Sequence, residues 1–393
     1  MRVKTVPLGE ICSIIGGGTP DRGEPSYWGG VIPWASVKDM TDLSLDRTVE
    51  TITPEGVANS ATNLIPKGQI IVPTRMALGK AAINAIPLAI NQDLKALKPK
   101  VGWDTHFLLW FLLSKASYLE GRGKGATVKG ITLDILRDLP VPSLDIDEQR
   151  RIAAILDKAD AIRRKRQQAL ALADDFLHSA FLEMFGDPVT NPKGWECAPI
   201  ESCISTVDAG WSAKGLDRPA CSDETGVLKI SAVTSGRYRP DENKAVEVIQ
   251  TGRLLVTPQK GDLLFSRANT RELVAATCIV DRTIDNVFLP DKIWRIRLRS
   301  QILTAEYLKF VFSNVGFRAI ICSKATGTSG SMLNISQSKL LETSVQIPPI
   351  DQQQEFSRLF WCVEETRAQL VAQLENDRAL FTSLSQRAFR GEL

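Results

Sequence analysis

The stretch DIDEQRRIAAILDKADAIRRKRQQALALADDFLHSAFLEMF, residues 145–185, decides the fold of this chain. Small and apolar residues recur in it at alternating steps of three and four, without an interrupting Pro or Gly. This is the heptad pattern of a coiled-coil helix. Asp145 or Asp147 can cap its start, and Gly186 followed by Pro188 can end it. Because each residue adds about 1.5 Å, the helix should be roughly 60 Å long and should need a partner along its apolar seam.

A second stretch of the same kind, DQQQEFSRLFWCVEETRAQLVAQLENDRALFTSLSQRAFRGEL, fills residues 351–393. Each stretch follows a Pro-rich lead-in, and Arg166, Arg367 and Asp377 interrupt the two seams. We therefore predict that the two helices form one antiparallel coiled coil. Its helix–helix seam should contain Ile152, Ile155, Ile162, Phe176, Phe356, Val363, Leu370, Phe381 and Leu384.

The chain also contains an internal repeat. Pro7 corresponds to Pro199, and the segment KGQIIVPTR at residues 67–75 corresponds to KGDLLFSR at residues 260–267. Such a period is far longer than that of solenoid repeats and indicates a duplicated domain. We predict globular domains at 1–144 and 187–350, a central helix at 145–186 and a C-terminal helix at 351–393.

The predicted fold class is α+β. It consists of two similar mixed α/β domains, separated and joined by the two long antiparallel helices and related by a pseudo-twofold axis. In each domain, β-rich runs such as GQIIVP and GDLLFS alternate with Gly- and Pro-rich turns. Each domain also has an apolar helix followed by a loop of small residues, GRGKGATVKG and KATGTSGSMLN. Such loops often bind phosphates through backbone N–H groups, although a plain connector is the alternative.

The composition limits the class of protein. The 393 residues leave room for two or three domains, and a net charge of +3 argues against a strongly basic nucleic-acid coat. The apolar runs are too short to cross a bilayer, and we expect no secretory segment. The seven cysteines form no CxxC pair, so we expect them to be reduced and buried in a cytoplasmic protein.

A search for catalytic machinery finds no enzyme. Neither His106 nor His178 has a nearby cluster of nucleophiles or metal ligands in the sequence, and the common hydrolase, zinc and phosphate-binding motifs are absent. GGGTP at residues 16–20 lacks the lysine of a nucleotide-binding loop. We expect it to form a turn in which glycine adopts a positive φ.

Two similar domains held apart by a rigid rod suit a ligand that has two sites at a defined spacing. Duplex DNA is the obvious ligand. One helical turn of DNA is about 34 Å long, so a rod of nearly 60 Å could set two half-sites about one turn apart. The two domains differ in sequence, so the DNA site should be bipartite and asymmetric.

These features resemble the specificity subunit of type I restriction–modification systems. The resemblance rests on PLGEIC, the PTR and GDLLFSR blocks, DEQRRIAAILDKADAIRRKRQ, LHSAFLEMFGDPVTNPKGWE and LSQRAFRGEL, and it spans residues 1–393. It implies a non-catalytic subunit in which two target-recognition domains each read one half of a split DNA site. The implied partners are double-stranded DNA, two methyltransferase (modification) subunits and restriction subunits that join this core, with no membrane. No cofactor is implied in this chain, because S-adenosylmethionine belongs to the methyltransferase.

The residues that contact DNA are predicted from their types and positions. Arg75 and Arg267 follow matching strands, where an arginine could pair with guanine or clamp a phosphate. A structural salt bridge or a strand-end cap is the alternative for both. The other predicted DNA contacts lie in loops or at strand ends, where a solvated side chain is the alternative: Lys80, Lys124, Lys129, Lys214, Arg271, Lys292, Ser329 and Ser331.

Two other functions stay open at this point. One is a stand-alone DNA methyltransferase or nuclease, which the missing catalytic and cofactor motifs disfavour. The other is a coiled-coil scaffold that binds only proteins and reads no DNA sequence. Exchange of the first globular domain separates these functions, because only a DNA reader would then change one half of its site.

Overall fold

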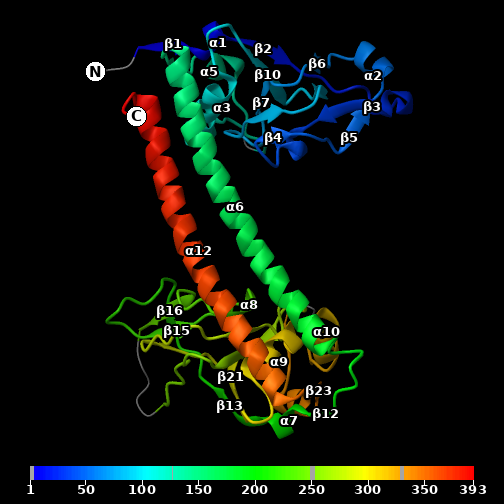
Figure 1. Cartoon of the computed structure of the whole chain (residues 1–393), viewed down its shortest axis with the longest axis vertical. Helices are drawn as coiled ribbons and strands as arrows, with labels where there is room; N and C mark the ends of the chain where they lie inside the picture. The colour runs from blue at the N-terminus through cyan, green and yellow to red at the C-terminus, as the bar shows by residue number, and fades with distance from the viewer. Residues whose placement is uncertain (1–3, 126, 248–252, 328–331) are drawn as a thin grey trace. The chain divides into compact units, whose positions relative to one another are not determined.

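The computed structural model describes residues 4–125, 127–247, 253–327 and 332–393. The chain divides into two compact units (Figure 1). Unit 1 consists of Met1–Gln168 and Val371–Leu393, and unit 2 consists of Ala169–Leu370. Each unit contains a mixed α/β domain and part of two long helices, α6 (Ile146–Phe185) and α12 (Ile350–Arg390). The predicted fold class of two mixed domains with two long helices is therefore confirmed.

Unit 1 is built on two sheets. The first has the strand order β2 (Cys12–Gly16), β10 (Leu94–Pro99), β7 (Ile70–Pro73), β8 (Ala82–Asn84) and β4 (Ser44–Leu45). The second has the order β5 (Glu50–Ile52), β3 (Trp28–Ala35), β9 (Leu88–Ile90) and β6 (Leu64–Ile65). A short antiparallel pair joins β1 (Thr5–Pro7) to β11 (Pro140–Pro142). The shorter helices are α1 (Leu8–Ile11), α2 (Pro54–Ala58), α3 (Thr105–Ser114), α4 (Ala116–Arg122) and α5 (Leu133–Arg137), with 3-10 turns η1 (Pro25–Tyr27) and η2 (Val37–Asp39).

Unit 2 repeats this plan. Its first sheet has the order β13 (Ile204–Ala209), β21 (Ile293–Leu298), β17 (Leu263–Ser266) and β19 (Thr277–Ile279). Its second has the order β14 (Gly215–Leu216), β16 (Asn243–Val246), β15 (Gly226–Leu228) and β20 (Val287–Phe288). Two short pairs join β12 (Cys197–Pro199) to β23 (Ser344–Gln346) and β18 (Ala268–Asn269) to β22 (Leu333–Asn334). The shorter helices are α7 (Ile200–Cys203), α8 (Ser231–Thr234), α9 (Ala305–Ser313), α10 (Val315–Ser323) and α11 (Gln337–Leu341).

The internal repeat extends to backbone detail. Pro7 and Pro199 precede α1 and α7 with nearly identical dihedral angles, φ −58° and ψ 138° against φ −58° and ψ 140°. Their fixed φ suits the residue that leads into a helix. The strand orders β2-β10-β7-β8 and β13-β21-β17-β19 also correspond. The duplication predicted from sequence is therefore visible in the topology.

The glycines of the GGGTP segment have a different role from the predicted one. Gly16, Gly17 and Gly18 do not adopt a positive φ, so that expectation is wrong. Glycine is needed at position 17 because the backbone passes too close to its neighbour. A Cβ atom on Gly17 would lie 2.2 Å from the carbonyl oxygens of Ile90 and Asn91. Gly210, at the same place in unit 2, would put a Cβ atom 1.6 Å from the carbonyl oxygen of Leu289.

Both long helices belong to the hydrophobic cores of the units. The Asp145 side chain caps α6 by accepting a hydrogen bond from the backbone N–H of Glu148 at 2.8 Å. In unit 1, Ile152 and Leu156 of α6 share a core with Ala388 of α12. In unit 2, the core is rich in aromatic side chains from both helices and from α9, namely Phe181, Phe185, Tyr307, Phe310 and Phe356.

The residues predicted for the helix–helix seam differ in their burial. Ile152 and Phe356 are buried, and Ile155, Val363, Leu370, Phe381 and Leu384 are half-buried. Ile162 and Phe176 are instead 41% and 51% exposed. A straight α-helix drifts by about 20° per heptad, so the buried face moves to the following residue, and Leu177 is buried in place of Phe176.

Polar residues occupy the middle of the seam in unit 1. Asp160 is buried, and Arg166 donates to the carboxylate of Asp377 from α12. This ion pair shows that α6 and α12 lie side by side within unit 1, as Figure 1 also shows. An ion pair therefore stands where a regular heptad would place an apolar contact between the two helices.

The cysteines only partly follow the prediction. Cys12, Cys203 and Cys278 are buried, but Cys197, Cys221 and Cys362 are exposed, so the expectation of general burial is wrong. All seven are free thiols. Among the described residues, no helix is both long enough and apolar enough to span a membrane.

Candidate nucleic-acid interface

In unit 1, Arg75 lies directly beside the loop of small residues. It follows β7, and the backbone N–H of Met76 donates to the carbonyl of Lys129 at 2.9 Å. Lys124 and Gly130 close this loop with two reciprocal backbone hydrogen bonds of 2.9 Å. The strand end and the loop, far apart in sequence, therefore form one surface.

The side chains on this surface are mainly cationic. The Arg75 side chain is 57% exposed, and its guanidinium lies 3.6 Å from one oxygen of Asp93. Lys124 and Lys129 are exposed. We call Arg75, Met76, Lys124 and Lys129 the Arg75 patch. An exposed guanidinium with two neighbouring ammonium groups can donate to phosphates or to the edge of a guanine base.

Arg267 has the same backbone setting in unit 2, but its side chain is used internally. It is 25% exposed. Its Nε donates to the carbonyl of Asp291 at 2.7 Å, and its Nη1 donates to Oδ1 of Asn334 at 2.9 Å. These bonds tie the end of β17 to the turn before β21 and to β22. In this structure Arg267 therefore fits the alternative interpretation, a structural tie.

The remaining predicted contacts are dispersed. Lys80 donates to the carbonyl of Met40 at 2.8 Å, which is a structural bond. Arg271 lines a hollow beside α10. Lys214 is exposed two residues after Ser212, whose hydroxyl donates to Asp291. Lys292 is half-buried and its carbonyl accepts from the N–H of Arg267 at 3.1 Å. Ser329 and Ser331 lie outside the described residues.

Met76 belongs to the patch, although the sequence contains no signal that singles it out. Its φ is +69°, a conformation that costs a non-glycine residue about 1–2 kcal/mol. Its side chain is 61% exposed, so core packing does not explain it. Strained residues of this kind occur preferentially at binding sites. Met76 thus adds an exposed apolar side chain next to Arg75, at the point where its backbone pairs with Lys129.

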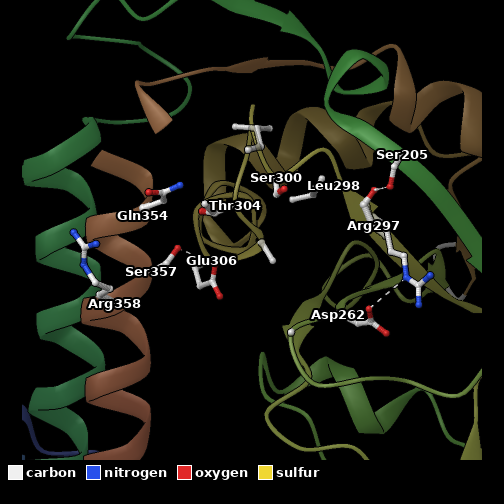
Figure 2. Close-up of a pocket in the computed structure, with 14 residues that line it drawn as sticks. Ser205, Asp262, Arg297, Leu298, Ser300, Thr304, Glu306, Gln354, Ser357 and Arg358 are labelled. Carbon is white, nitrogen blue, oxygen red and sulfur yellow. Dashed lines mark hydrogen bonds and ion pairs between the residues drawn. The ribbon is translucent and has the colours of Figure 1, made fainter. Parts of the chain in front are cut away.

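Unit 2 also contains an open hollow of about 730 Å³ between β21 and the start of α12 (Figure 2). In Figure 2 Arg297 reaches toward Asp262, with 3.7 Å between the charged groups. The buried carboxylate of Glu306 accepts from the Ser357 hydroxyl at 2.9 Å and from the Trp361 indole N–H at 2.7 Å. These bonds join α9 to α12. None of the predicted DNA contacts that the structure describes lines this hollow.

The described residues contain no arrangement suited to catalysis by a metal. Within residues 4–125, 127–247, 253–327 and 332–393, no three His, Cys, Asp or Glu side chains gather as metal ligands would. His106 has a structural contact that the sequence did not reveal. Its Nδ1 lies 3.0 Å from the carboxylate of Asp157, which also accepts from the Trp110 indole N–H at 2.8 Å. These contacts fasten α3 to α6.

Comparison with known proteins finds a family model that matches the first domain and the start of α6. Residues 2–172 match the family described as the type I restriction modification DNA specificity domain. The EcoEI specificity subunit of Escherichia coli is 33% identical over 169 residues, which cover 41% of this chain and 27% of that protein. The type I S subunit from M. genitalium superposes with a TM-score of 0.63 at 12% identity, over 99% of this chain and 96% of that one.

A second solved structure, from work on complex assembly and conformational transition of the type I R-M system, gives a TM-score of 0.56 at 15% identity. It covers 100% of this chain and 98% of that chain. The chain spans about half or less of the length of the first curated relatives that it matches. Residues 2–172 thus match the model of the type I restriction modification DNA specificity domain, and the chain has the fold seen in solved type I S subunits.

Proposed function

We propose that this chain is the sequence-reading subunit of a type I restriction–modification complex. In this proposal, each globular domain reads one half of a bipartite, asymmetric DNA site. The domains are those predicted from the sequence, residues 1–144 and 187–350. The chain itself performs no chemistry, and the site it selects is modified by associated methyltransferase subunits.

One observation carries the proposal. The two units share one topology, yet the side chains differ at the corresponding strand ends beside the loops. Arg75 is left exposed with two lysines beside it, whereas Arg267 is bound to Asp291 and Asn334. A duplicated scaffold with dissimilar surfaces at matching positions is what two different half-sites require. A plain scaffold has no need for this difference.

The Arg75 patch can supply both kinds of DNA contact. A guanidinium presents two parallel N–H groups, which match O6 and N7 of guanine, and such a pair contributes about 1–3 kcal/mol of discrimination. Lys124 and Lys129 can hold flanking phosphates, which fixes register without reading sequence. Met76 can contact a thymine methyl group or enter a base step, as exposed apolar side chains do in other complexes.

Exposed apolar residues on the long helices support a protein partner. Leu172 and Phe176 are one turn apart on α6, and both are more than half exposed. Apolar helix faces left open to water commonly form protein interfaces. We propose that methyltransferase subunits cover this part of α6, and that restriction subunits join the resulting core. S-adenosylmethionine would then bind to the methyltransferase and not to this chain.

Exchange of residues 1–144 for the corresponding domain of another family member tests the proposal. The hybrid, assembled with the methyltransferase, should recognise a site in which one half has changed and the other half and the spacer are retained. A hybrid that assembles but keeps both halves of the site would contradict reading by the first domain. Loss of both halves together would show that the domains do not act separately.

A further inference from the structure

In unit 2, one arginine connects the globular domain to both long helices. Arg237 lies in the turn between α8 and β16. Its Nη1 is 2.8 Å and 3.0 Å from the two carboxylate oxygens of Glu364 on α12. Its Nη2 donates to the carboxylate of Asp174 on α6. We call these three residues the Arg237 clamp.

The contact between Arg237 and Glu364 is largely shielded from water, with side chains 29% and 21% exposed, whereas Asp174 at the edge of the clamp is 51% exposed. Arg367, from α12, approaches both acids, with its Nε 3.8 Å from Asp174. Lys309 is near enough to interact with the charges of Arg237 and Glu364. Shielded charges are costly to leave unpaired, so the domain has one strongly preferred docking angle on the helices.

The geometry of a guanidinium strengthens this conclusion. Its donors are held in one plane, and a fork that serves two carboxylates on two helices tolerates little rotation. A surface pair between flexible side chains would allow more movement and contribute little. The Arg237 clamp therefore fixes the orientation of the globular domain on the helices, which a non-directional electrostatic attraction would not do.

Unit 1 has a joint of the opposite polarity at the corresponding place. Asp160 and Arg163 of α6 correspond by the repeat to Glu364 and Arg367 of α12, and they form the same ion pair, at 2.6 Å. Here, however, the globular domain contributes a carboxylate, Asp42, which accepts from Arg164 of α6. That hydrogen bond lowers the pKa of Asp42. The globular domain thus contributes an acidic side chain to the joint of unit 1 and a basic side chain to the joint of unit 2.

The opposite polarity has a consequence for docking. Under the repeat, Arg378 of α12 in unit 1 corresponds to Asp174 of α6 in unit 2. A globular domain that presented a carboxylate like Asp42 to unit 2 would meet Asp174 and Glu364. A carboxylate at the position of the Arg237 guanidinium would be repelled by both acids, whereas the guanidinium itself is attracted to both. Each domain is therefore matched in charge to its own part of the helices.

We propose that Arg237 is a positioning residue, which fixes the second globular domain on α6 and α12 and thereby restricts the spacer length that the complex accepts. This inference rests on the proposed function. One additional base pair moves a half-site by about 3.4 Å and turns it by about 35°. The hydrogen bonds of the clamp cannot survive a displacement of that size, so an intact clamp excludes sites with longer or shorter spacers.

The test measures spacer tolerance in cells that express the chain with its methyltransferase. Genome-wide methylation is mapped, and the methylated fraction at sites with one base pair more or fewer is divided by that at cognate sites. In Arg237→Ala this ratio should rise at least ten-fold, while the base sequences of both half-sites stay the same. Arg237→Lys keeps the charge but cannot donate to both acids, so its ratio should lie between those of the wild type and Arg237→Ala.

Arg218→Ala is the matched control. Arg218 forms an exposed pair with Glu224 at 2.6 Å in the same globular domain, and among the described residues its side-chain hydrogen bonds go only to residues 219–224. Its ratio should equal that of the wild type. A second disruption, Glu364→Gln, removes one acid of the clamp without changing shape and should also raise the ratio.

Four outcomes are informative. An unchanged ratio in the assembled Arg237→Ala complex would overturn the proposal. If that variant does not assemble, unchanged ratios in Arg237→Lys and Glu364→Gln would overturn the proposal, and raised ratios would support it. A fall in methylation at all spacers by the same factor would show only a loss of stability and would also overturn it. If the wild-type complex methylates no bipartite motif, the proposed function fails, independently of Arg237.

Discussion

The side chains of Gln149 and Gln353 make the same three hydrogen bonds, one set in each unit. The amide of Gln149 accepts from the N–H of Asp104 at 2.9 Å and donates to the carbonyls of Gly102 and Leu144 at 3.1 Å and 2.9 Å. Gln353 accepts from the N–H of Thr304 at 3.0 Å and donates to the carbonyls of Ile302 and Pro348 at 3.0 Å and 2.8 Å. Both glutamines are completely buried. Each fastens the first turn of a long helix to its domain.

Replacement of either glutamine should therefore destabilise its own unit. In Gln353→Leu three buried backbone groups lose their partners, and the free energy of unfolding should fall by about 3 kcal/mol. Urea unfolding followed by circular dichroism measures the change. Gln354→Ala, an exposed neighbour on α12, is the control and should differ little from the wild type. Equal stability of Gln353→Leu and Gln354→Ala would contradict the structural role of the amide.

Arg75 and Arg267 should respond differently to the same substitution. Arg75→Ala should leave stability nearly unchanged and weaken discrimination at one base pair by about 1–3 kcal/mol. Arg267→Ala should instead lower the free energy of unfolding by about 1–3 kcal/mol, because Asp291 and Asn334 lose a shared donor. Binding to a panel of single-base variants, together with urea unfolding, separates the two effects. If Arg267→Ala relaxes sequence preference without a loss of stability, the structural interpretation of Arg267 is wrong.

The lysines of the Arg75 patch should determine part of the salt dependence of DNA binding. Each phosphate contact contributes about 0.9 to the slope of log affinity against log salt concentration. The double variant Lys124→Ala/Lys129→Ala should lower that slope by about 2 and weaken specific and non-specific binding alike. Titrations at several salt concentrations check this. The control Lys67→Ala/Lys158→Ala removes two exposed lysines outside the patch, and an equal loss of slope there would argue against a localised interface.

Lys309 should make the stability of unit 2 depend on pH. Its pKa is lowered from 10.5 to about 8, first because the side chain is buried and second because Arg237 is close. Between these values the unfolded chain binds more protons than the folded one. The free energy of unfolding should therefore rise as the pH increases from about 8 to 10.5.

Lys309→Met removes this titration. The difference in stability between the variant and the wild type should change by up to about 3 kcal/mol between pH 7.5 and pH 10.5, with the variant favoured at the lower pH. Urea unfolding across this range measures it. Lys193→Met, at an exposed site, provides the reference. Parallel pH profiles for Lys309→Met and the wild type would be inconsistent with a depressed pKa.

The sequence predicted the architecture because its main signals are local or periodic. The heptads gave both long helices, and the repeated blocks gave the duplicated domain. The drift of a straight helix relative to a heptad is small in each step but accumulates, so a strict heptad predicts Phe176 in the seam although Leu177 is the buried residue. The repeated glutamines of DEQ and DQQ, Gln149 and Gln353, were visible in the sequence as equivalent positions.

The details of the interface depend on contacts between distant segments. Arg75 and Arg267 look alike in sequence, and only the positions of Asp93, Asp291 and Asn334 distinguish an exposed guanidinium from a bound one. The positive φ of Met76 likewise occurs where its backbone N–H pairs with Lys129, 53 positions later in the chain. Sequence patterns do not report such pairings, so these assignments required the fold.

The most direct test of the account is genome-wide methylation mapping in cells that express this chain together with its neighbouring methyltransferase. Cells with the methyltransferase alone provide the comparison. The account predicts methylation at one split motif with a fixed spacer, present only when this chain is expressed. Identical maps from both strains, with the two proteins soluble and assembled, would contradict sequence reading by this chain and would favour a protein-binding scaffold.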